Sequence, residues 1–276
     1  MKPGRMSQTA LEVGASLVAL SAKDDWAQRL PPGLVAATER LLLASGAPGY
    51  GPRLIRLSKR PWMIRVYELQ DLMMPGQFEA LGHRKIFVQQ KVEAALAHSA
   101  GQVLVIGAGF DTLCLRLAPQ YSAVQSFEVD HPATSAAKAR GIALEDAPAN
   151  LIQIAADLGE RPLSMVLSED GRWQTSLPSV LVAEGLFQYL SDEQVRGLFR
   201  ETARCTPPGS QFVFTHAIPG TGRILSILTR LIAEPWKSAV RSEDLPEYVT
   251  GTGWAITSDV DTDSAHGVER YAVARR

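Results

Sequence analysis

The sequence predicts an α/β protein with a doubly wound sheet of seven mostly parallel strands, helices before the sheet and a helical insertion before the last strands. After residue 100, short apolar runs bounded by turn residues alternate with helical patterns, which is typical of buried parallel strands joined by right-handed crossovers. Before residue 100 the pattern is helical. The last two strands are expected to pair antiparallel. The seven expected strands are Gln102–Ile106, Ala123–Val129, Leu151–Ala155, Ser179–Ala183, Gln211–His216, Trp254–Asp259 and Glu269–Ala274.

The helical patterns divide the chain into a cap or lid region, residues 1–99, and a core, residues 100–276, with an insertion at about residues 221–248. Ser191 is expected to cap its helix, because its hydroxyl can accept a free backbone N–H of the first turn. The helices expected in the cap region are Thr9–Ala22, Pro32–Ser45, Trp62–Met74 and Arg84–Ala97, and those expected between strands are Leu113–Ala118, Ala133–Glu145 and Asp192–Cys205.

Composition excludes several classes of partner. The 276 residues carry a formal charge of −1 and are 46% apolar, so a large core can be buried while no basic field attracts nucleic acid. Cys114 and Cys205 match no metal-ligand spacing and no disulfide framework, which favours a reducing, cytoplasmic setting and no metal. No apolar stretch approaches the roughly 20 residues of a membrane span, so no membrane partner is expected.

A glycine-rich turn follows the first strand, in the segment GAGFDT of residues 107–112. Gly107 and Gly109 allow the backbone to approach a ligand closely at a helix N-terminus. A dinucleotide site would favour a glycine where Thr112 stands, and Asp111 would repel a pyrophosphate. S-adenosylmethionine carries a sulfonium and an ammonium, so the acidic loop favours this methyl donor. An incidental tight turn is the alternative.

Acidic residues stand at the ends of the next three strands. Asp130 can accept hydrogen bonds from ribose hydroxyls, with Glu128 bracing it, or it can cap the following helix. Asp157 with Leu158 can hold an adenine, or Asp157 is a simple turn residue. Glu184 follows four apolar strand residues, where an unpaired carboxylate would be costly to bury, so we expect it to face a ligand.

These motifs, in this order and spacing, resemble the leucine carboxyl methyltransferase family, including its bacterial branch of O-methyltransferases of polyketide and other secondary metabolism. The matching signatures are GAGFDT, FEVDHP with the following Lys138, AADL and AEGLFQYLSDEQV, which together span roughly residues 80 to 216. The resemblance implies a class I, Rossmann-like methyltransferase fold that uses S-adenosyl-L-methionine and releases S-adenosyl-L-homocysteine.

The resemblance also implies roles for single residues. Gly107 would lie against the donor, Asp130 would bind the ribose, and Asp157 with Leu158 would hold the adenine. Glu184 would face the methionine moiety. Arg84, on a helix before the first strand, matches the family's arginine for the donor carboxylate, since guanidinium and carboxylate can pair bidentately. The neighbouring Lys85 fits a solvated helix position better.

For the methyl acceptor, the sequence favours a carboxylate or hydroxyl of a small secondary metabolite. A carboxylate needs no general base, whereas a hydroxyl would benefit from one. His216, at the end of the fifth strand, can be that base, or it can line the pocket or bond to backbone. Tyr189 can touch the acceptor or belong to the core. Both are catalytic candidates.

Three other functions remain as alternatives. A protein C-terminal carboxyl methyltransferase would share the chemistry but would need a docking surface for its partner. A nicotinamide-dependent oxidoreductase is disfavoured by Asp111 and Thr112. A binding protein that keeps the fold without the chemistry is the third. The sequence leaves the acceptor, the pathway and the oligomeric state open.

Overall fold

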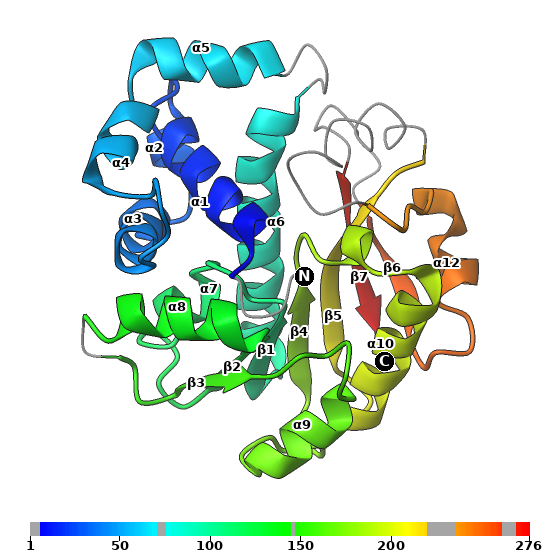
Figure 1. Ribbon diagram of the computed structural model, residues 1–276. Coiled ribbons are helices and arrows are strands. Elements are labelled where there is room, and N and C mark those ends of the chain that lie inside the picture. The colour runs from blue at the N-terminus through cyan, green and yellow to red at the C-terminus, as the bar shows by residue number, and fades with distance from the viewer. Residues whose placement is uncertain (1–5, 71–75, 145–146, 220–235, 261–268) are drawn as a thin grey trace.

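The fold is a seven-stranded sheet with helices on both faces and a group of helices above one edge (Figure 1). It is seen in a computed structural model that describes residues 6–70, 76–144, 147–219, 236–260 and 269–276. The α/β fold class is confirmed. The strands are β1 Gln102–Ile106, β2 Gln125–Asp130, β3 Leu151–Ala155, β4 Ser179–Ala183, β5 Gln211–Ala217, β6 Ala255–Val260 and β7 Glu269–Arg275.

The strand order explains where a ligand can bind. The order is β3-β2-β1-β4-β5-β7-β6, with parallel pairing from β3 to β5 and antiparallel pairing of β7 with both β5 and β6. From β1 the chain first adds β2 and β3 on one side of β1. It then returns to add β4 and β5 on the other side, so β2 and β4 flank β1. In such sheets, ligands bind beyond the carboxyl ends of the strands at this switch point.

Helices before the sheet form the upper left part of Figure 1, and the remaining helices cover the sheet. The helices before the sheet are α1 Gln8–Leu20, α2 Trp26–Arg29, α3 Leu34–Ala44, α4 Pro52–Ser58, α5 Pro61–Gln70 and α6 Gln77–His98. Those after β1 are α7 Leu113–Leu117, α8 Pro132–Ile142, α9 Leu163–Asp170, α10 Asp192–Cys205 and α12 Leu245–Tyr248, with the 3₁₀ turns η1 Phe187–Tyr189 and η2 Ser242–Asp244.

The helix predicted from Arg84 begins seven residues earlier, at Gln77. Gly76, in the left-handed region with φ 75°, precedes this first turn. Gly82 lies inside the helix, where the sequence signal is weak because glycine is a poor helix former. Its role is packing, since a Cβ at Gly82 would lie 2.3 Å from the Trp26 ring. The missing side chain lets α6 approach the segment that contains α2.

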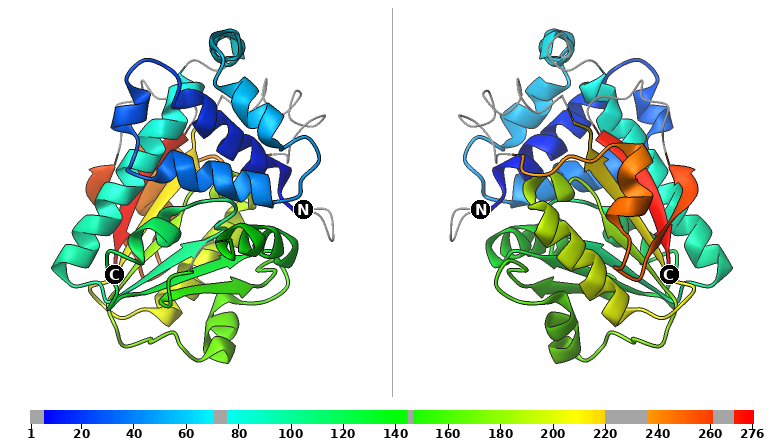
Figure 2. Two further views of the ribbon diagram at one scale, coloured as in Figure 1. Left: turned by 90° about the vertical axis from the view of Figure 1, so that its left-hand side faces the viewer. Right: turned by 90° about the vertical axis from the view of Figure 1, so that its right-hand side faces the viewer.

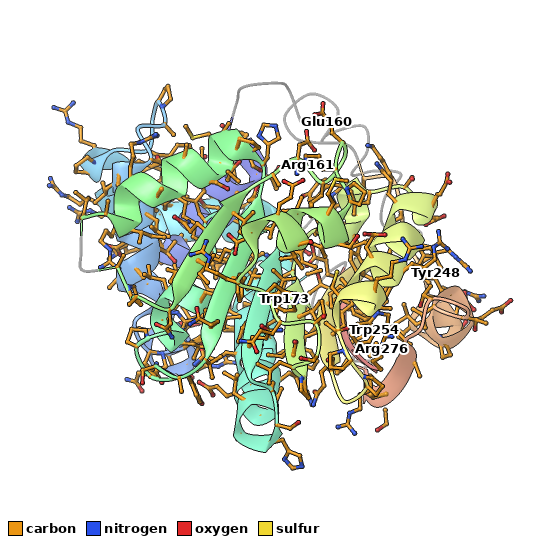
Figure 3. The ribbon with its side chains drawn as sticks, turned by 90° about the horizontal axis from the view of Figure 1, so that it is seen from below. Glu160, Arg161, Trp173, Tyr248, Trp254 and Arg276 are labelled. Atoms are coloured by element: carbon orange, nitrogen blue, oxygen red, sulfur yellow. The ribbon has the colours of Figure 1, made fainter. Side chains whose placement is uncertain are left out.

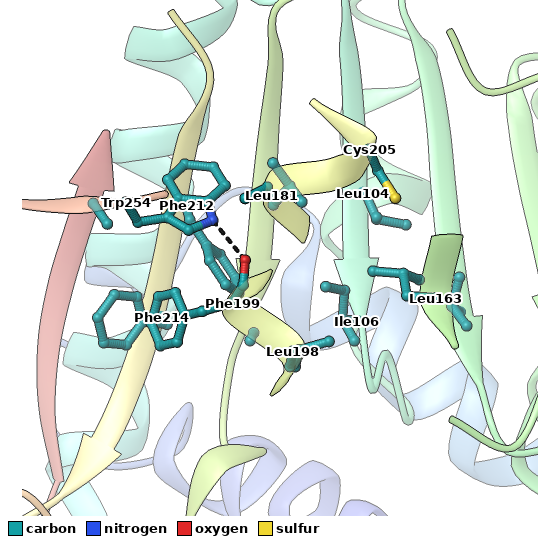
Figure 4. Close-up of a cluster of buried hydrophobic side chains, with 14 of the residues drawn as sticks. Leu104, Ile106, Leu163, Leu181, Leu198, Phe199, Cys205, Phe212, Phe214 and Trp254 are labelled. Atoms are coloured by element: carbon teal, nitrogen blue, oxygen red, sulfur yellow. Dashed lines mark hydrogen bonds between the residues drawn. The ribbon is translucent and has the colours of Figure 1, made fainter. Parts of the chain in front are cut away.

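Aromatic side chains fill the space between the sheet and α10 (Figure 4). Phe199 of α10 contacts Phe212 and Phe214 of β5, with ring centroids 5.2 and 5.3 Å apart. Trp254 packs on Phe212 and donates its Nε1–H to the Phe199 carbonyl at 2.9 Å. Aromatic rings contribute large buried apolar areas, and the indole N–H is satisfied rather than stranded. This cluster holds α10 against the sheet.

The start of α10 is fixed by the predicted cap. The Ser191 hydroxyl accepts the Gln194 N–H, and the Gln194 side chain accepts the Ser191 N–H, so both groups of a capping box are present. Removing such a cap costs about 1 kcal/mol. The Ser191 prediction is confirmed. Two tryptophans beneath this part of the sheet, Trp173 and Trp254, bond to backbone carbonyls of α10 (Figure 3).

The helices before the sheet cover one side of the strand ends, as the turned views show (Figure 2). The second half of α6 packs on the sheet itself through Val88, Val92 and Ala95. Most of the insertion expected at residues 221–248 lies outside the described residues, and its described part holds η2 and α12. Within the described residues, no helix is long and apolar enough to cross a membrane.

Candidate active site

A cavity of about 1110 Å³ opens at the carboxyl ends of the central strands. Drug-sized ligands occupy pockets of roughly 300–1000 Å³, so this one has room for a donor and an acceptor together. Its walls come from the strand ends on one side and from α1, α5 and α6 on the other. Every donor-binding residue expected from the sequence lines it. These residues are Arg84, Gly107, Gly109, Asp130, Asp157, Leu158 and Glu184.

The glycine turn after β1 is tight and closely packed. Gly107 and Gly109 have φ values of 68° and 48°, in the left-handed region that favours glycine. The Gly107 N–H donates to the Val129 carbonyl at 2.8 Å, which ties the turn to β2. A Cβ at Gly109 would lie 3.1 Å from the Ala10 side chain, so α1 packs closely against the turn. At these two glycines the turn therefore presents backbone to the cavity.

Asp130, at the end of β2, holds this turn in place. Its Oδ2 accepts the Gly109 N–H, and its Oδ1 accepts the N–H of His131 at 2.6 Å. Burial raises the Asp130 pKa even though both bonds favour the carboxylate. Each carboxylate oxygen can accept a second bond. Asp130 therefore positions the loop and keeps acceptor capacity for hydroxyl groups in the cavity.

Glu128 lies deeper in β2 than Asp130 and does not touch it. Its Oε2 lies 2.7 Å from the Lys138 Nζ of α8, and both side chains are almost fully buried. Burial raises the Glu128 pKa, an effect that the Lys138 ammonium opposes. The pair joins β2 to α8 beneath the loop, so any bracing of Asp130 runs through the backbone of β2.

Asp157 sits at the rim, after β3. Its Oδ1 accepts the Gly159 N–H at 2.8 Å, which is the turn contact that the sequence offered as one alternative. The other oxygen lies 3.8 Å from His131 Nε2. The half-buried Leu158 lines the cavity beside it. The turn and the adenine roles are therefore compatible, because the turn uses only one of the two carboxylate oxygens.

A buried cluster of charges lies between α6 and the strand ends. The Arg84 Nε is 2.8 Å from Glu184 Oε1, and its Nη1 donates to Glu269 Oε2 at 2.6 Å. The Lys85 Nζ pairs with Asp111 and lies 2.6 Å from Glu184 Oε1. Two cations thus face three carboxylates, so the cluster carries a formal charge of −1. Such a charge favours a ligand with cationic groups.

The cluster corrects two sequence expectations. Lys85 was expected to be solvated, but it is buried in ion pairs. The Asp111 carboxylate is neutralised by Lys85 and accepts the Leu113 N–H at the start of α7. Asp111 alone therefore does not repel a pyrophosphate. The net charge of the whole cluster disfavours such a ligand instead.

Neighbouring opposite charges keep Lys85 and Asp111 ionised despite burial. Burial alone would lower the Lys85 pKa, but the carboxylates of Asp111 and Glu184 raise it above its ordinary value. Burial would raise the Asp111 pKa, but Lys85 holds it well below its ordinary value. Opposite charges within a few ångströms in a poorly hydrated site account for both directions. Lys85 and Asp111 are therefore both charged at neutral pH.

Glu269, like Lys85, is a site residue that the sequence analysis missed. It is the first residue of β7, and antiparallel pairing with β5 places it opposite Ala217, at the carboxyl edge of the parallel strands. Besides holding Arg84, it accepts the Gln188 amide at 2.8 Å. Its position in the sequence could have revealed it. The first residue of an antiparallel strand lies at the same edge of the sheet as Glu184, which follows a parallel strand.

Two buried acceptor atoms of residues that line the cavity lack a donor in the described part of the chain. Within the described residues, Glu184 Oε2 and Gln188 Oε1 have no hydrogen-bond donor. Both side chains line the cavity, and each is at least nine-tenths buried. Buried acceptors are normally satisfied, so these atoms mark a place for a donor group of a ligand. An ammonium has enough N–H groups to donate to both atoms, and its positive charge complements the negative charge of the cluster.

The two tentative catalytic residues lie in different places. Tyr189 lines the cavity, and burial together with Glu269 raises its pKa to about 12. His216 does not line the cavity formed by the described residues; it faces a small pocket under Val240. Its Nδ1 lies 2.9 Å from the Val240 carbonyl, and burial lowers its pKa to about 4. The backbone-bonded alternative fits His216, and its placement does not support the base role. The described residues contain no group of three metal-ligating side chains.

Comparisons with known proteins agree with this geometry. A relative in Parafrankia sp. (strain EAN1pec) is 29% identical over 239 residues, covering 84% of this chain and 69% of its own. YktD of Bacillus subtilis is 27% identical over 193 residues, covering 65% of this chain and 62% of its own. Both are provisionally named S-adenosyl-L-methionine-dependent methyltransferases. The chain thus spans about two thirds of the length of these relatives.

Solved structures show the same fold. A protein of Thermobifida fusca, provisionally titled a methyltransferase, has a TM-score of 0.60 at 17% identity and covers 89% of this chain and 98% of its own. The CcbJ methyltransferase of Streptomyces caelestis has a TM-score of 0.51 at 14% identity, covering 68% and 88%. The class I methyltransferase fold is confirmed. The model of the family "Leucine carboxyl methyltransferase" matches residues 53–203, more than half of the chain, so this protein belongs to the leucine carboxyl methyltransferase family.

Proposed function

We propose that the protein is an S-adenosylmethionine-dependent methyltransferase that methylates an oxygen of a small molecule. The observation that carries the proposal is the cavity, where seven expected donor-binding residues converge around a buried cluster of charge −1. This donor set suits a ligand with ribose hydroxyls, an adenine, an ammonium and a sulfonium. The names of the relatives agree with this donor.

The residues divide the work of holding the donor. Asp130 would accept the ribose hydroxyls, and Asp157 with Leu158 would hold the adenine. The open acceptors of Glu184 and Gln188 would receive the ammonium. Arg84 is already paired with two carboxylates, so its contribution to the donor carboxylate would come from its remaining N–H groups.

When bound, S-adenosylmethionine supplies an electrophilic methyl group on sulfur, ready for in-line displacement. The protein then has to align the two reactants and exclude water, which is where its catalytic contribution would lie. The cavity wall formed by α1, α5 and α6 can exclude water from the donor. An acceptor that is ionised at neutral pH would need no proton removed.

A carboxylate is the acceptor that the site favours. Tyr189, with its raised pKa of about 12, stays protonated at neutral pH, and His216 lies outside the described cavity. Neither candidate is therefore a good base for a neutral hydroxyl. A hydroxyl acceptor and the secondary-metabolite class remain part of the proposal on the strength of the family resemblance. The buried free thiols of Cys114 and Cys205 suit a reducing cytoplasm, which we propose as its location.

Calorimetric titration tests the donor. S-adenosylmethionine and S-adenosylhomocysteine are expected to bind in the micromolar range, and NAD is expected not to bind. Tight binding of NAD with neither of the others would contradict the proposal. A screen of carboxylic acids and phenols for uptake of labelled methyl groups then tests the acceptor. Methylation of phenols alone, with a rate that rises with the ionisation of the phenol, would replace the carboxylate with a hydroxyl acceptor.

A further inference from the structure

One surface of the helices before the sheet combines positive charge with exposed apolar side chains. It is formed by α4, α5 and their connection, residues 53–69, which we call the α4–α5 surface. In Figure 1, α5 lies along the top of the molecule, at the edge farthest from the sheet, and the turned views agree. The surface is therefore the outermost part of the cap.

The charge of this surface is strongly positive. It carries five exposed cations and one acid, Glu68, which gives a formal charge of +4 in a chain whose total is −1. Glu68 pairs with Lys23, and Lys59 pairs with Glu39. Among the residues that the structure describes, none of the four arginines forms an ion pair. The exposed cations are Arg53, Arg56, Lys59, Arg60 and Arg65.

The same surface exposes large apolar side chains. Trp62, Val66 and Leu69 are spaced four and three residues apart, on one face of α5, and Trp62 and Leu69 are 53% and 62% exposed. Leu57 adds a fourth from α4. Seven large apolar side chains are exposed in the described residues, and these four fall within 13 positions of one another. Exposed apolar side chains gathered in this way mark an interaction site.

We propose that the α4–α5 surface docks on an anionic lipid bilayer. Arginines pair with lipid phosphates, aliphatic side chains enter the acyl boundary, and tryptophan favours the interface between them. A nucleic acid would use the cations but not Leu57, Val66 and Leu69. A protein partner would need matching acids and an apolar pocket. An anionic bilayer uses both halves of the surface at once and needs no specific pocket.

This inference goes beyond the proposed function and departs from one sequence expectation. The absence of a membrane partner was inferred from the absence of a spanning segment, which does not bear on a helix that lies along a bilayer surface. The opposite side of α5 carries Tyr67, which lines the cavity and stacks on Phe78 at 4.9 Å. Docking would therefore place the cap side of the cavity beside the bilayer.

Co-sedimentation with lipid vesicles tests the proposal. The full chain is mixed with vesicles of phosphatidylcholine alone and with vesicles that also contain an equal part of phosphatidylglycerol. We expect pelleting only with the anionic vesicles and weaker pelleting at high salt, because the Debye length shrinks to roughly 3 Å at molar salt. Equal pelleting with both vesicle types, or none with either, would overturn the proposal.

Two double variants separate charge from apolar contact. Arg56→Glu/Arg60→Glu should weaken vesicle binding by roughly tenfold or more, and Trp62→Ser/Leu69→Ser should weaken it severalfold. The matched control is Arg275→Glu/Arg276→Glu, which makes the same charge change at two exposed residues near the other end of the molecule. Control binding should stay within about twofold of the parent. An equal loss in the control would mean that net charge, and not this surface, governs binding.

Folding and self-association of the variants are measured separately. Calorimetry with S-adenosylhomocysteine should give unchanged affinity in all three variants, because none of these residues lines the cavity. This readout tests the folded state without depending on vesicles. Sedimentation velocity tests for a second copy of the chain as the occupant. A dimer that dissociates in Trp62→Ser/Leu69→Ser, without vesicle binding by the parent, would overturn the bilayer proposal.

Discussion

The two walls of the cavity differ in chemistry and in how the sequence specifies them. The wall at the strand ends is polar and carries Asp130, Glu184 and the glycine turn, each at the end of a strand or directly after one. The wall from the cap is more apolar, with Leu17, Leu81 and Phe78. The sheet topology fixes the positions of the strand-end residues. The positions of the cap residues at the cavity depend on how the helices pack. The first wall is therefore visible in sequence motifs, whereas Arg84 is the only expected donor-binding residue from the second.

The largest expected effect comes from Glu269. Its ion pair with Arg84 joins β7 to α6 and so joins the two walls. Glu269→Ala should lower the free energy of unfolding by about 3–5 kcal/mol, because it leaves a buried guanidinium with only one carboxylate. Urea denaturation measures this loss. Glu247→Ala, at an exposed acid, is the control and should change little. A loss of less than about 1 kcal/mol in Glu269→Ala would mean that the pair does not hold the walls together.

Asp130 tests the polar wall alone. Asp130→Ala removes the acceptor of the Gly109 and His131 N–H groups together with the proposed ribose contact. S-adenosylhomocysteine affinity should fall by about 10- to 100-fold, since bonds to a charged group contribute about 1.5–3 kcal/mol each. Calorimetry measures the affinity, with Glu193→Ala on the exposed side of α10 as the control. Unchanged affinity in Asp130→Ala would remove the ribose assignment.

The two walls also differ in how much could be predicted. The bounds of β1, β3 and β4 agree with the expected strands, because short apolar runs between glycines and polar residues leave few alternatives. The helices α2, α4 and α9 were not predicted, because each is eight residues or fewer and has little periodicity to detect. Lys85 and Glu269 were missed as site residues because their roles arise from partners distant in sequence.

His216 gives a smaller effect that depends on pH. Its pKa in the folded protein, about 4, lies below its ordinary value, so the unfolded chain binds the proton more readily. The stability contribution is present above about pH 6.5 and is lost as the pH falls toward 4; about 2 kcal/mol should be lost between pH 7 and pH 5. Urea denaturation at both pH values measures it. In His216→Gln, the loss of stability between pH 7 and pH 5 should be smaller than in the parent by about 2 kcal/mol. An identical loss in the variant and the parent would mean that another group titrates.

The smallest effect tests the apolar wall. Gly82→Ala places a methyl group against the Trp26 ring, so the free energy of unfolding should fall by at least about 1 kcal/mol. S-adenosylhomocysteine affinity should remain unchanged, because the strand-end wall is intact. Thermal denaturation and calorimetry measure the two quantities. Gly197→Ala, at a helical glycine with open space around it, is the control for stability alone, because Gly197 lines the cavity. A loss of affinity without a loss of stability would mean that the cap wall contributes to donor binding.

The central claim is that the strand-end wall holds the methyl donor. A crystal structure with S-adenosylhomocysteine tests it most directly. We expect the adenine beside Asp157 and Leu158, the ribose hydroxyls on Asp130, and the amino group on Glu184 and Gln188. A nucleoside bound against the cap helices, with Asp130 facing no part of it, would contradict the account.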